Sequence, residues 1–197
     1  MFNKLFGRGS SASSGPEERL KATEGSASAE LAAEMLTRPS ALEQLTREEA
    51  RIVVSYMMPH KIAEGITFIK EGDTKETDFM ILVLDGEVTV ESIVVSRTEP
   101  ITVTVLGRGS LIGEMGLLDG EPRNASCTAI SELRCAILSR ASLKKLLDDD
   151  PRTAAKFILA ISLRIAERMR DGAEKLKLYS QLTQAMQEEI NSLAPSN

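Results

Sequence analysis

The residues best suited to chemistry lie in one glycine-rich stretch, LGRGSLIGEMGLLDGEPRNAS, between residues 106 and 126. Its first glycines follow an apolar run with the spacing Gly-x-Gly-x-x-x-Gly. A dinucleotide-binding fold needs a long helix after such glycines and a βαβ unit around them. Here about one helical turn fits before Asp119, Gly120 and Pro122 end it. The spacing therefore argues against a dinucleotide-binding fold.

A short helix beginning near Gly113 predicts an anion site, because its first backbone N–H groups and the positive end of its dipole converge on one point. Arg123 follows ten residues later, beyond a turn, and its planar guanidinium matches two phosphate oxygens. Glu114 would repel a phosphate unless it accepts hydrogen bonds from the same ligand, as it can from sugar hydroxyls. Together these residues favour a nucleotide whose phosphate and ribose are compactly joined.

This stretch resembles the phosphate-binding cassette of the cyclic nucleotide-binding domain family, whose pattern is Gly-Glu, a short apolar helix, then Pro-Arg, a small residue and Ala. The motifs EGD at 71–73 and LDGEV at 84–88, and the helical segment after Pro151, support the resemblance over residues 42–171. It implies a mainly β fold with flanking helices: an eight-stranded antiparallel jelly-roll barrel, short N-terminal helices and a long C-terminal helix. It also implies cyclic AMP or cyclic GMP as the ligand, without a cofactor or metal.

The resemblance also assigns roles to single residues. It implies that Glu114 binds the ribose 2′-hydroxyl and that Arg123 binds the cyclic phosphate. The other ligand-binding positions that it implies are Gly113, Met115, Gly116, Asn124 and Ala125. Gly116 departs from the family pattern, in which alanine or serine is common, and a glycine here weakens the helix by up to about 1 kcal/mol relative to alanine.

The identity of the base stays open. Asn124 can donate to a phosphate or accept from a guanine amino group, so it does not decide between adenine and guanine. Arg168 falls where bacterial transcription factors of this family read adenine, and Thr104 precedes the cassette on a strand. Both are candidate base contacts, with a solvated arginine and an ordinary strand threonine as the alternatives.

Short β-branched runs at roughly ten-residue spacing predict the strands that position the cassette. These runs are residues 65–70, 79–84, 88–95, 101–106, 125–130 and 133–138, with turns rich in Gly, Asp and Pro between them. Two capping-box patterns, Ser40-x-x-Glu43 and Thr46-x-x-Glu49, predict helices before the strands. Helical character returns at Ala141 and continues in two pieces, divided at Pro151, to about Leu193.

The composition argues against several classes of function. The chain has 197 residues and a formal net charge of −5, which opposes non-specific binding to DNA. One histidine, His60, and two cysteines, Cys127 and Cys135, cannot assemble the usual zinc sites, and the cysteines are expected to be buried thiols. The sequence lacks an apolar run of about 18 residues, which argues against a transmembrane segment and favours a cytoplasmic protein. We expect no catalytic residues and no enzymatic activity.

The two ends of the chain are expected to pass the signal of ligand binding to a partner. We expect residues 1–29 to form a flexible leader, because this segment is rich in Gly, Ser and Ala. We expect residues 30–171 to form the sensor domain and residues 172–197 to form a helical extension. Apolar heptad positions between residues 158 and 193 predict a seam for a homodimer. Packing on the chain's own barrel is the alternative. The 26 residues after Asp171 are too few for a helix-turn-helix domain, so DNA is not an expected partner.

The predicted function is therefore a stand-alone sensor of cyclic AMP or cyclic GMP, which relays binding through its C-terminal helix or its leader to an unidentified protein partner. Two alternatives stay open. One is a ligand-independent docking module that uses the same barrel, and the other is a variant that responds to cyclic di-GMP.

Overall fold

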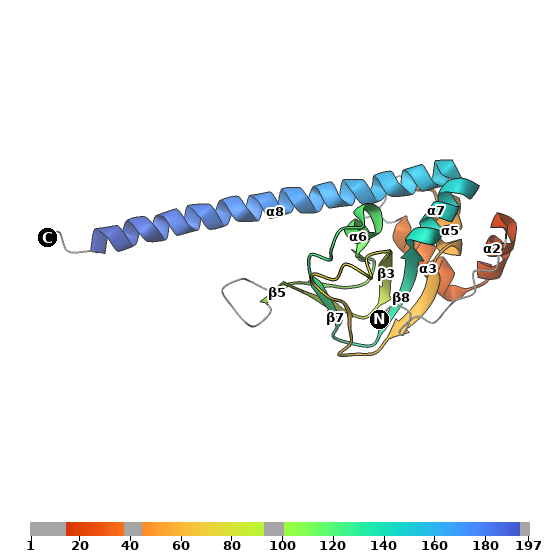
Figure 1. The fold of residues 1–197 in the computed structure, drawn as a ribbon, viewed down its shortest axis with the longest axis horizontal. Coiled ribbons are helices and arrows are strands. Elements are labelled where there is room, and N and C mark those ends of the chain that lie inside the picture. The colour runs from red at the N-terminus through yellow and green to blue at the C-terminus, as the bar shows by residue number, and fades with distance from the viewer. Residues whose placement is uncertain (1–14, 38–44, 93–100, 194–197) are drawn as a thin grey trace. The chain divides into compact units, whose positions relative to one another are not determined.

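The computed structural model describes residues 15–37, 45–92 and 101–193. Within these residues, eight strands build two four-stranded antiparallel sheets (Figure 1). The strands are β1 (Met58–Ile62), β2 (Thr67–Ile69), β3 (Phe79–Asp85), β4 (Val88–Ser92), β5 (Ile101–Leu106), β6 (Leu111–Ile112), β7 (Ser126–Ala129) and β8 (Leu133–Ser139). The predicted jelly-roll fold with flanking helices is confirmed.

Strands that are distant in sequence pair with one another. The order is β1-β8-β3-β6 in one sheet and β2-β7-β4-β5 in the other. The sequence patterns did not predict β1 or β6. Strand β1 carries Pro59 at a sheet edge, where the missing N–H costs no ladder bond, and β6 has only two residues. Residues 93–95 of a predicted strand lie outside the described residues.

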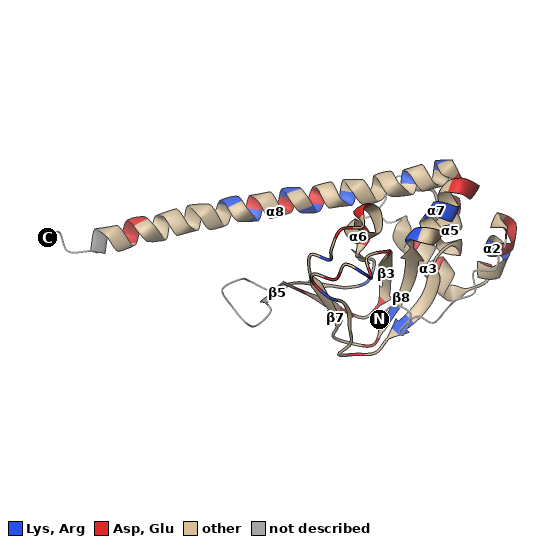
Figure 2. Ribbon diagram, viewed as in Figure 1, with Lys and Arg blue, Asp and Glu red and all other residues tan. Residues whose placement is uncertain are grey.

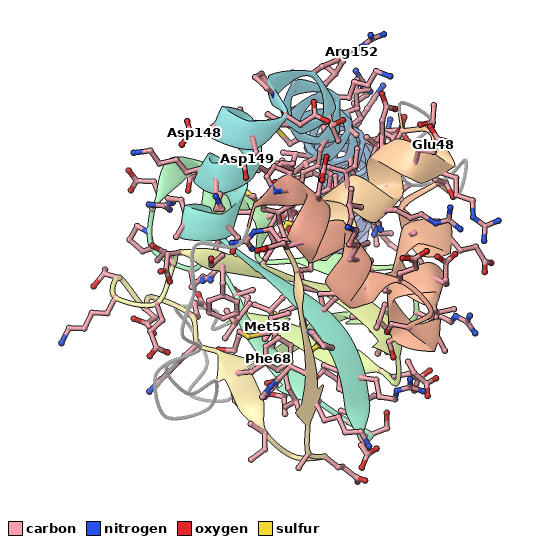
Figure 3. All side chains as sticks on the ribbon, turned by 90° about the vertical axis from the view of Figure 1, so that its right-hand side faces the viewer. Glu48, Met58, Phe68, Asp148, Asp149 and Arg152 are labelled. Atoms are coloured by element: carbon pink, nitrogen blue, oxygen red, sulfur yellow. The ribbon has the colours of Figure 1, made fainter. Side chains whose placement is uncertain are left out.

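The core fills the space between the two sheets. Every residue of β3 except Asp85 is buried, and Phe79, Ile81 and Val83 face this interior. The opposite sheet contributes Phe68, labelled in Figure 3, and Cys127. Cys127 and Cys135 are buried free thiols, as predicted. Because both faces of β3 are covered, this strand is a rigid base for the loops at its ends.

Among the described residues, three helices precede the strands: α2 (Pro16–Thr23), α3 (Ala27–Leu36) and α5 (Arg47–Ser55). Helix α3 packs against α5 and β3. The capping box predicted at Thr46 is confirmed, because the Thr46 hydroxyl accepts from the Glu49 N–H at 3.2 Å and the Glu49 carboxylate accepts from the Thr46 N–H at 2.9 Å. The box predicted at Ser40 lies outside the described residues.

Helix α2 lies within the segment predicted as a leader. Pro16 begins the helix with a pre-set φ, and Glu17 and Glu18 in its first turn interact favourably with its dipole. The Arg19 guanidinium stacks on the Tyr56 ring, 5.1 Å from its centroid, and joins α2 to the residue that ends α5. Composition alone did not reveal this partner. The division into a leader, a sensor domain and a C-terminal extension stays a prediction. Residues 1–14 lie outside the described residues.

In the described part of the chain, two helices follow the strands, as predicted. They are α7 (Arg140–Asp149), whose N-terminus is capped by Ser139, and α8 (Pro151–Leu193). Helix α8 continues without a break through Gly172 and through the boundary predicted after residue 171. The chain divides into two compact units, residues 1–160 and 161–197. Lys, Arg, Asp and Glu alternate along the middle of α8 (Figure 2).

Candidate functional site

The cassette helix forms where the glycine pattern predicts it. Helix α6 (Glu114–Asp119) follows β6 and is bounded by Gly113, with φ of 84°, and Gly120, with φ of 79°. Both angles lie in the left-handed region, which glycine adopts without steric cost. The Leu117 N–H donates to the Gly113 oxygen at 3.2 Å, and the Gly120 N–H closes the helix on the Gly116 oxygen at 3.0 Å. The two glycines thus limit α6 to six residues.

The Arg123 side chain folds back beneath α6. Nη1 donates to the Gly113 oxygen at 2.9 Å, and Nη2 donates to the Phe79 oxygen at 2.9 Å. Nε and Nη2 both donate to the Glu76 oxygen, at 3.1 and 2.9 Å. The guanidinium also lies on the Phe79 ring, 4.7 Å from its centroid. Four of its five N–H groups are therefore used on main-chain oxygens, and one N–H on Nη1 remains.

Arg123 is a buried cation whose hydrogen-bond partners are all neutral. The residue is 4% exposed, and no carboxylate of the described residues forms an ion pair with it. Burial lowers the pKa of the guanidinium, although an arginine stays protonated. A desolvated positive charge is stabilised strongly by an anion. The charges of Asp78, Asp73 and Glu114 oppose this effect of burial on the pKa. A phosphate is an anion of the kind that the guanidinium can bind with its fork of N–H donors.

The main chain of Arg123 is held by the EGD turn at 71–73. The Gly72 N–H donates to the Arg123 oxygen at 2.7 Å, and the Arg123 N–H donates to the Asp73 oxygen at 3.0 Å. This reciprocal pair explains why the EGD motif and the cassette occur together, although about 50 residues separate them. The β2–β3 connection thus holds both the backbone and the guanidinium of Arg123.

The other cassette residues lie around this guanidinium. Glu114, the first residue of α6, is 3% exposed. Gly116 is buried, and a Cβ atom added there would lie 2.8 Å from Nη1 of Arg123. Asn124 is exposed and donates to the Sδ atom of half-buried Met115 at 3.5 Å. Ala125, also half-buried, precedes β7.

The two candidate base contacts lie on elements other than the cassette helix. Thr104 is exposed on β5, in register with Val90. Arg168 is exposed on α8, within the second compact unit. Both assignments therefore stay predictions.

Sequence reasoning missed three contributors to the site. Two are the main-chain oxygens of Glu76 and Phe79, which leave no signature in side-chain types. The third is Arg140, whose Nε donates to the Leu117 oxygen at 3.0 Å and whose Nη2 donates to the Gly116 oxygen. Its place at the first position of α7, directly after the capping Ser139, was the available signal.

Among the residues that the structure describes, His, Cys, Asp and Glu do not gather in groups of three or more able to hold a metal ion. None of the described helices combines the length and apolar character needed to cross a membrane.

Comparison with known proteins decides the family. Residues 59–150 match the cyclic nucleotide-binding domain family, and this range contains the whole cassette. This part of the chain is similar to cyclic nucleotide-binding domains. A crystal structure of such a domain from Methylobacillus flagellatus matches with a TM-score of 0.68 and 29% identity, over 77% of this chain and 83% of that one.

Two curated relatives of the cyclic nucleotide-binding domain are bacterial regulators. The cyclic AMP receptor protein of Thermus thermophilus is 29% identical over 136 residues, which are 69% of this chain and 60% of that protein. The CRP-like cAMP-activated global transcriptional regulator of Mycobacterium tuberculosis is 24% identical over 127 residues, 64% of this chain and 52% of that protein. The chain thus spans between about half and three fifths of these relatives' lengths.

Proposed function

We propose that this chain is a non-enzymatic sensor that binds cyclic AMP or cyclic GMP at the α6 cassette. The observation that carries the proposal is the buried Arg123 guanidinium, which donates to main-chain oxygens and forms no ion pair among the described residues. It lies in a segment that matches the family and that also contains buried Glu114. A cyclic nucleotide offers one negative charge and a ribose hydroxyl close together, which suits this pair of side chains.

The chemistry of binding is an exchange of acceptors. A hydrogen bond from a guanidinium to an ionised phosphate oxygen is roughly twice as strong as one to a neutral carbonyl. The remaining N–H on Nη1 would bind one phosphate oxygen. A second guanidinium N–H, which now donates to the oxygen of Gly113 or Phe79, would bind another, so that the two form a fork. Glu114 would accept the ribose 2′-hydroxyl. Its negative charge disfavours ligands that bring a second phosphate charge to the same place.

The names of the relatives favour cyclic AMP as the first ligand to test, since both curated bacterial relatives are named for cyclic AMP. A second solved structure, 26% identical with a TM-score of 0.54, comes from work on a cyclic-GMP-dependent signalling pathway. Both nucleotides therefore belong in the experiment. Arg168 and Thr104 stay the proposed base contacts.

We propose that the output passes through a homodimer formed by α8. Its exposed apolar residues include Met169, Leu176, Tyr179, Met186 and Ile190, which recur at alternating intervals of three and four residues once Gly172 and Thr183 are counted. This heptad spacing is typical of a helix that packs on a helix of the same kind. A second copy of the chain supplies such a helix.

Isothermal titration calorimetry on the full chain tests the ligand proposal with cyclic AMP, cyclic GMP and cyclic di-GMP. We expect heat with a cyclic mononucleotide and a loss of about 2–5 kcal/mol of binding free energy in Arg123→Ala. The matched control is Arg152→Ala, since Arg152 is exposed at the start of α8 (Figure 3). Binding of cyclic di-GMP alone would indicate a different ligand class, and no heat with any nucleotide would favour a ligand-independent docking module.

A further inference from the structure

A second arginine holds the opposite end of the cassette helix. Arg140, the first residue of α7, donates from Nε to the Leu117 oxygen at 3.0 Å and from Nη2 to the Gly116 oxygen. A Cβ atom added at Gly120 would lie 3.1 Å from Nη1 and 3.2 Å from Nη2 of Arg140. Gly120 therefore does two things: it ends α6 in the left-handed conformation, and it leaves room for this guanidinium.

The two arginines share one anchor, the segment Glu76–Phe79. Arg123 donates to the oxygens of Glu76 and Phe79, and the main-chain N–H of Arg140 donates to the Asp78 oxygen at 2.7 Å. Between these contacts, the Thr77 hydroxyl donates to the Gly120 oxygen at 3.3 Å. Each of the four consecutive residues thus bonds either to an arginine or to the end of α6.

These contacts form one connected network. Arg123 holds the N-terminal end of α6 through Gly113, and Arg140 holds its C-terminal end through Gly116 and Leu117. A cation at the last carbonyls of a helix also interacts favourably with its dipole. Because α6 has only six residues, both arginines act on the same one and a half turns or so. Both ends of α6 are thus joined by hydrogen bonds to the same segment, Glu76–Phe79.

We propose that Arg140 is the positioning residue that couples the cassette to α7. The proposal rests on the proposed function, in which a cyclic phosphate exchanges with carbonyl partners of Arg123. That exchange weakens the hydrogen bonds from Arg123 to the oxygens of Gly113 and Phe79. The resulting shift is passed through α6 and through the Asp78 oxygen to Arg140. Arg140 begins α7, whose buried Leu143 and Leu146 place it against the body of the domain. The ligand thereby alters α7, the helix that leads into α8.

Hydrogen exchange of the full chain, followed by mass spectrometry with and without cyclic AMP, tests this coupling. In the wild type, cyclic AMP is expected to change exchange in both α6 and α7. In Arg140→Gln, the change in α6 persists and the change in α7 is lost. Arg140→Lys keeps the charge but cannot span two carbonyls, so it is expected to behave like the glutamine variant. Arg152→Gln, which alters an exposed arginine outside this network, is expected to respond like the wild type.

A response of α7 that survives in Arg140→Gln overturns the proposal, and so does a full response in Arg140→Lys, which would reduce the contact to a charge effect. Unchanged α7 exchange in a wild type that binds cyclic AMP overturns it as well. The ligand-free arm separates this failure from failure of the proposed function. Without nucleotide, the Gly120 amide is expected to exchange about tenfold faster in Arg140→Gln, because its acceptor Gly116 loses a second restraint. An unchanged rate there overturns the positioning role even if no nucleotide binds.

Discussion

The guanidinium of Arg123 donates to the main-chain oxygen of Gly113 at 2.9 Å, across the ten residues that contain α6. Arg123 therefore supports the fold through this contact, and it is also the residue proposed to bind the phosphate of the nucleotide. Both roles use the same N–H groups, so the strength of ligand binding depends on what the guanidinium gives up.

Arg123→Lys is expected to lower the free energy of unfolding without ligand by about 1–3 kcal/mol, because an ammonium cannot reach the oxygens of Glu76, Phe79 and Gly113 together and leaves buried acceptors unsatisfied. Urea unfolding followed by circular dichroism measures the change. Arg152→Lys, on an exposed arginine, is the control and is expected to be neutral. If both variants unfold at the same urea concentration as the wild type, the contacts of Arg123 do not support the fold.

Gly116→Ala is expected to destabilise the domain despite the higher helix propensity of alanine. The added Cβ would lie 2.8 Å from Nη1 of Arg123 and 3.2 Å from the Thr77 oxygen, so the guanidinium or the backbone must shift. Gly107→Ala is the control, because a Cβ there meets only the Gly86 oxygen at 4.0 Å. Thermal unfolding compares them. A Gly116→Ala protein that gains up to about 1 kcal/mol, as helix propensity alone predicts, would show that α6 does not close on Arg123.

Much of the cassette could be predicted from the sequence because its backbone demands glycine at particular points. Gly113 and Gly120 set the ends of α6, and a chain that turns after Gly120 brings Arg123 back to Gly113. The acceptors of the guanidinium could not be predicted, since any residue type supplies a carbonyl oxygen. Strand β1 was not predicted because Pro59 and Lys61 interrupt its apolar pattern. Helix α2 was not predicted because its segment is short and polar, and its partner Tyr56 lies beyond α3 in the sequence.

Acid is expected to weaken the packing of α5 on α8. A hydrogen bond from Lys156, together with one from the Thr46 backbone, lowers the pKa of Glu49 below its ordinary value of 4.5. A carboxylate whose pKa is lower in the folded state stabilises the fold above the unfolded pKa, and this contribution is lost as the pH falls through the folded value. The free energy of unfolding, measured with urea between about pH 7 and pH 3, should therefore fall less steeply with decreasing pH in Glu49→Gln than in the wild type. Glu64→Gln, on an exposed residue, is the control, and equal slopes for all three proteins would contradict the assignment.

Leu176→Glu is expected to convert the proposed dimer to a monomer, because it places a charge at a seam position of α8 that is 72% exposed in the single chain. Sedimentation equilibrium measures the molecular mass in solution. Leu178→Glu is the matched control, since Leu178 is exposed on the same helix but lies outside the heptad seam. A monomeric wild type would refute the dimer, and equal dissociation by both variants would place the interface elsewhere on α8.

The central claim is that Arg123 takes the phosphate of a cyclic nucleotide. The most direct test is a cyclic AMP titration followed by nitrogen-15 NMR of the arginine Nε–H groups, with Arg123→Lys identifying the Arg123 signal and Arg152 as the internal reference. The account predicts that the Arg123 signal shifts as cyclic AMP saturates the protein, while the signal of Arg152 does not. Saturation with the Arg123 signal unmoved would contradict the account, because the phosphate would then be held by other groups.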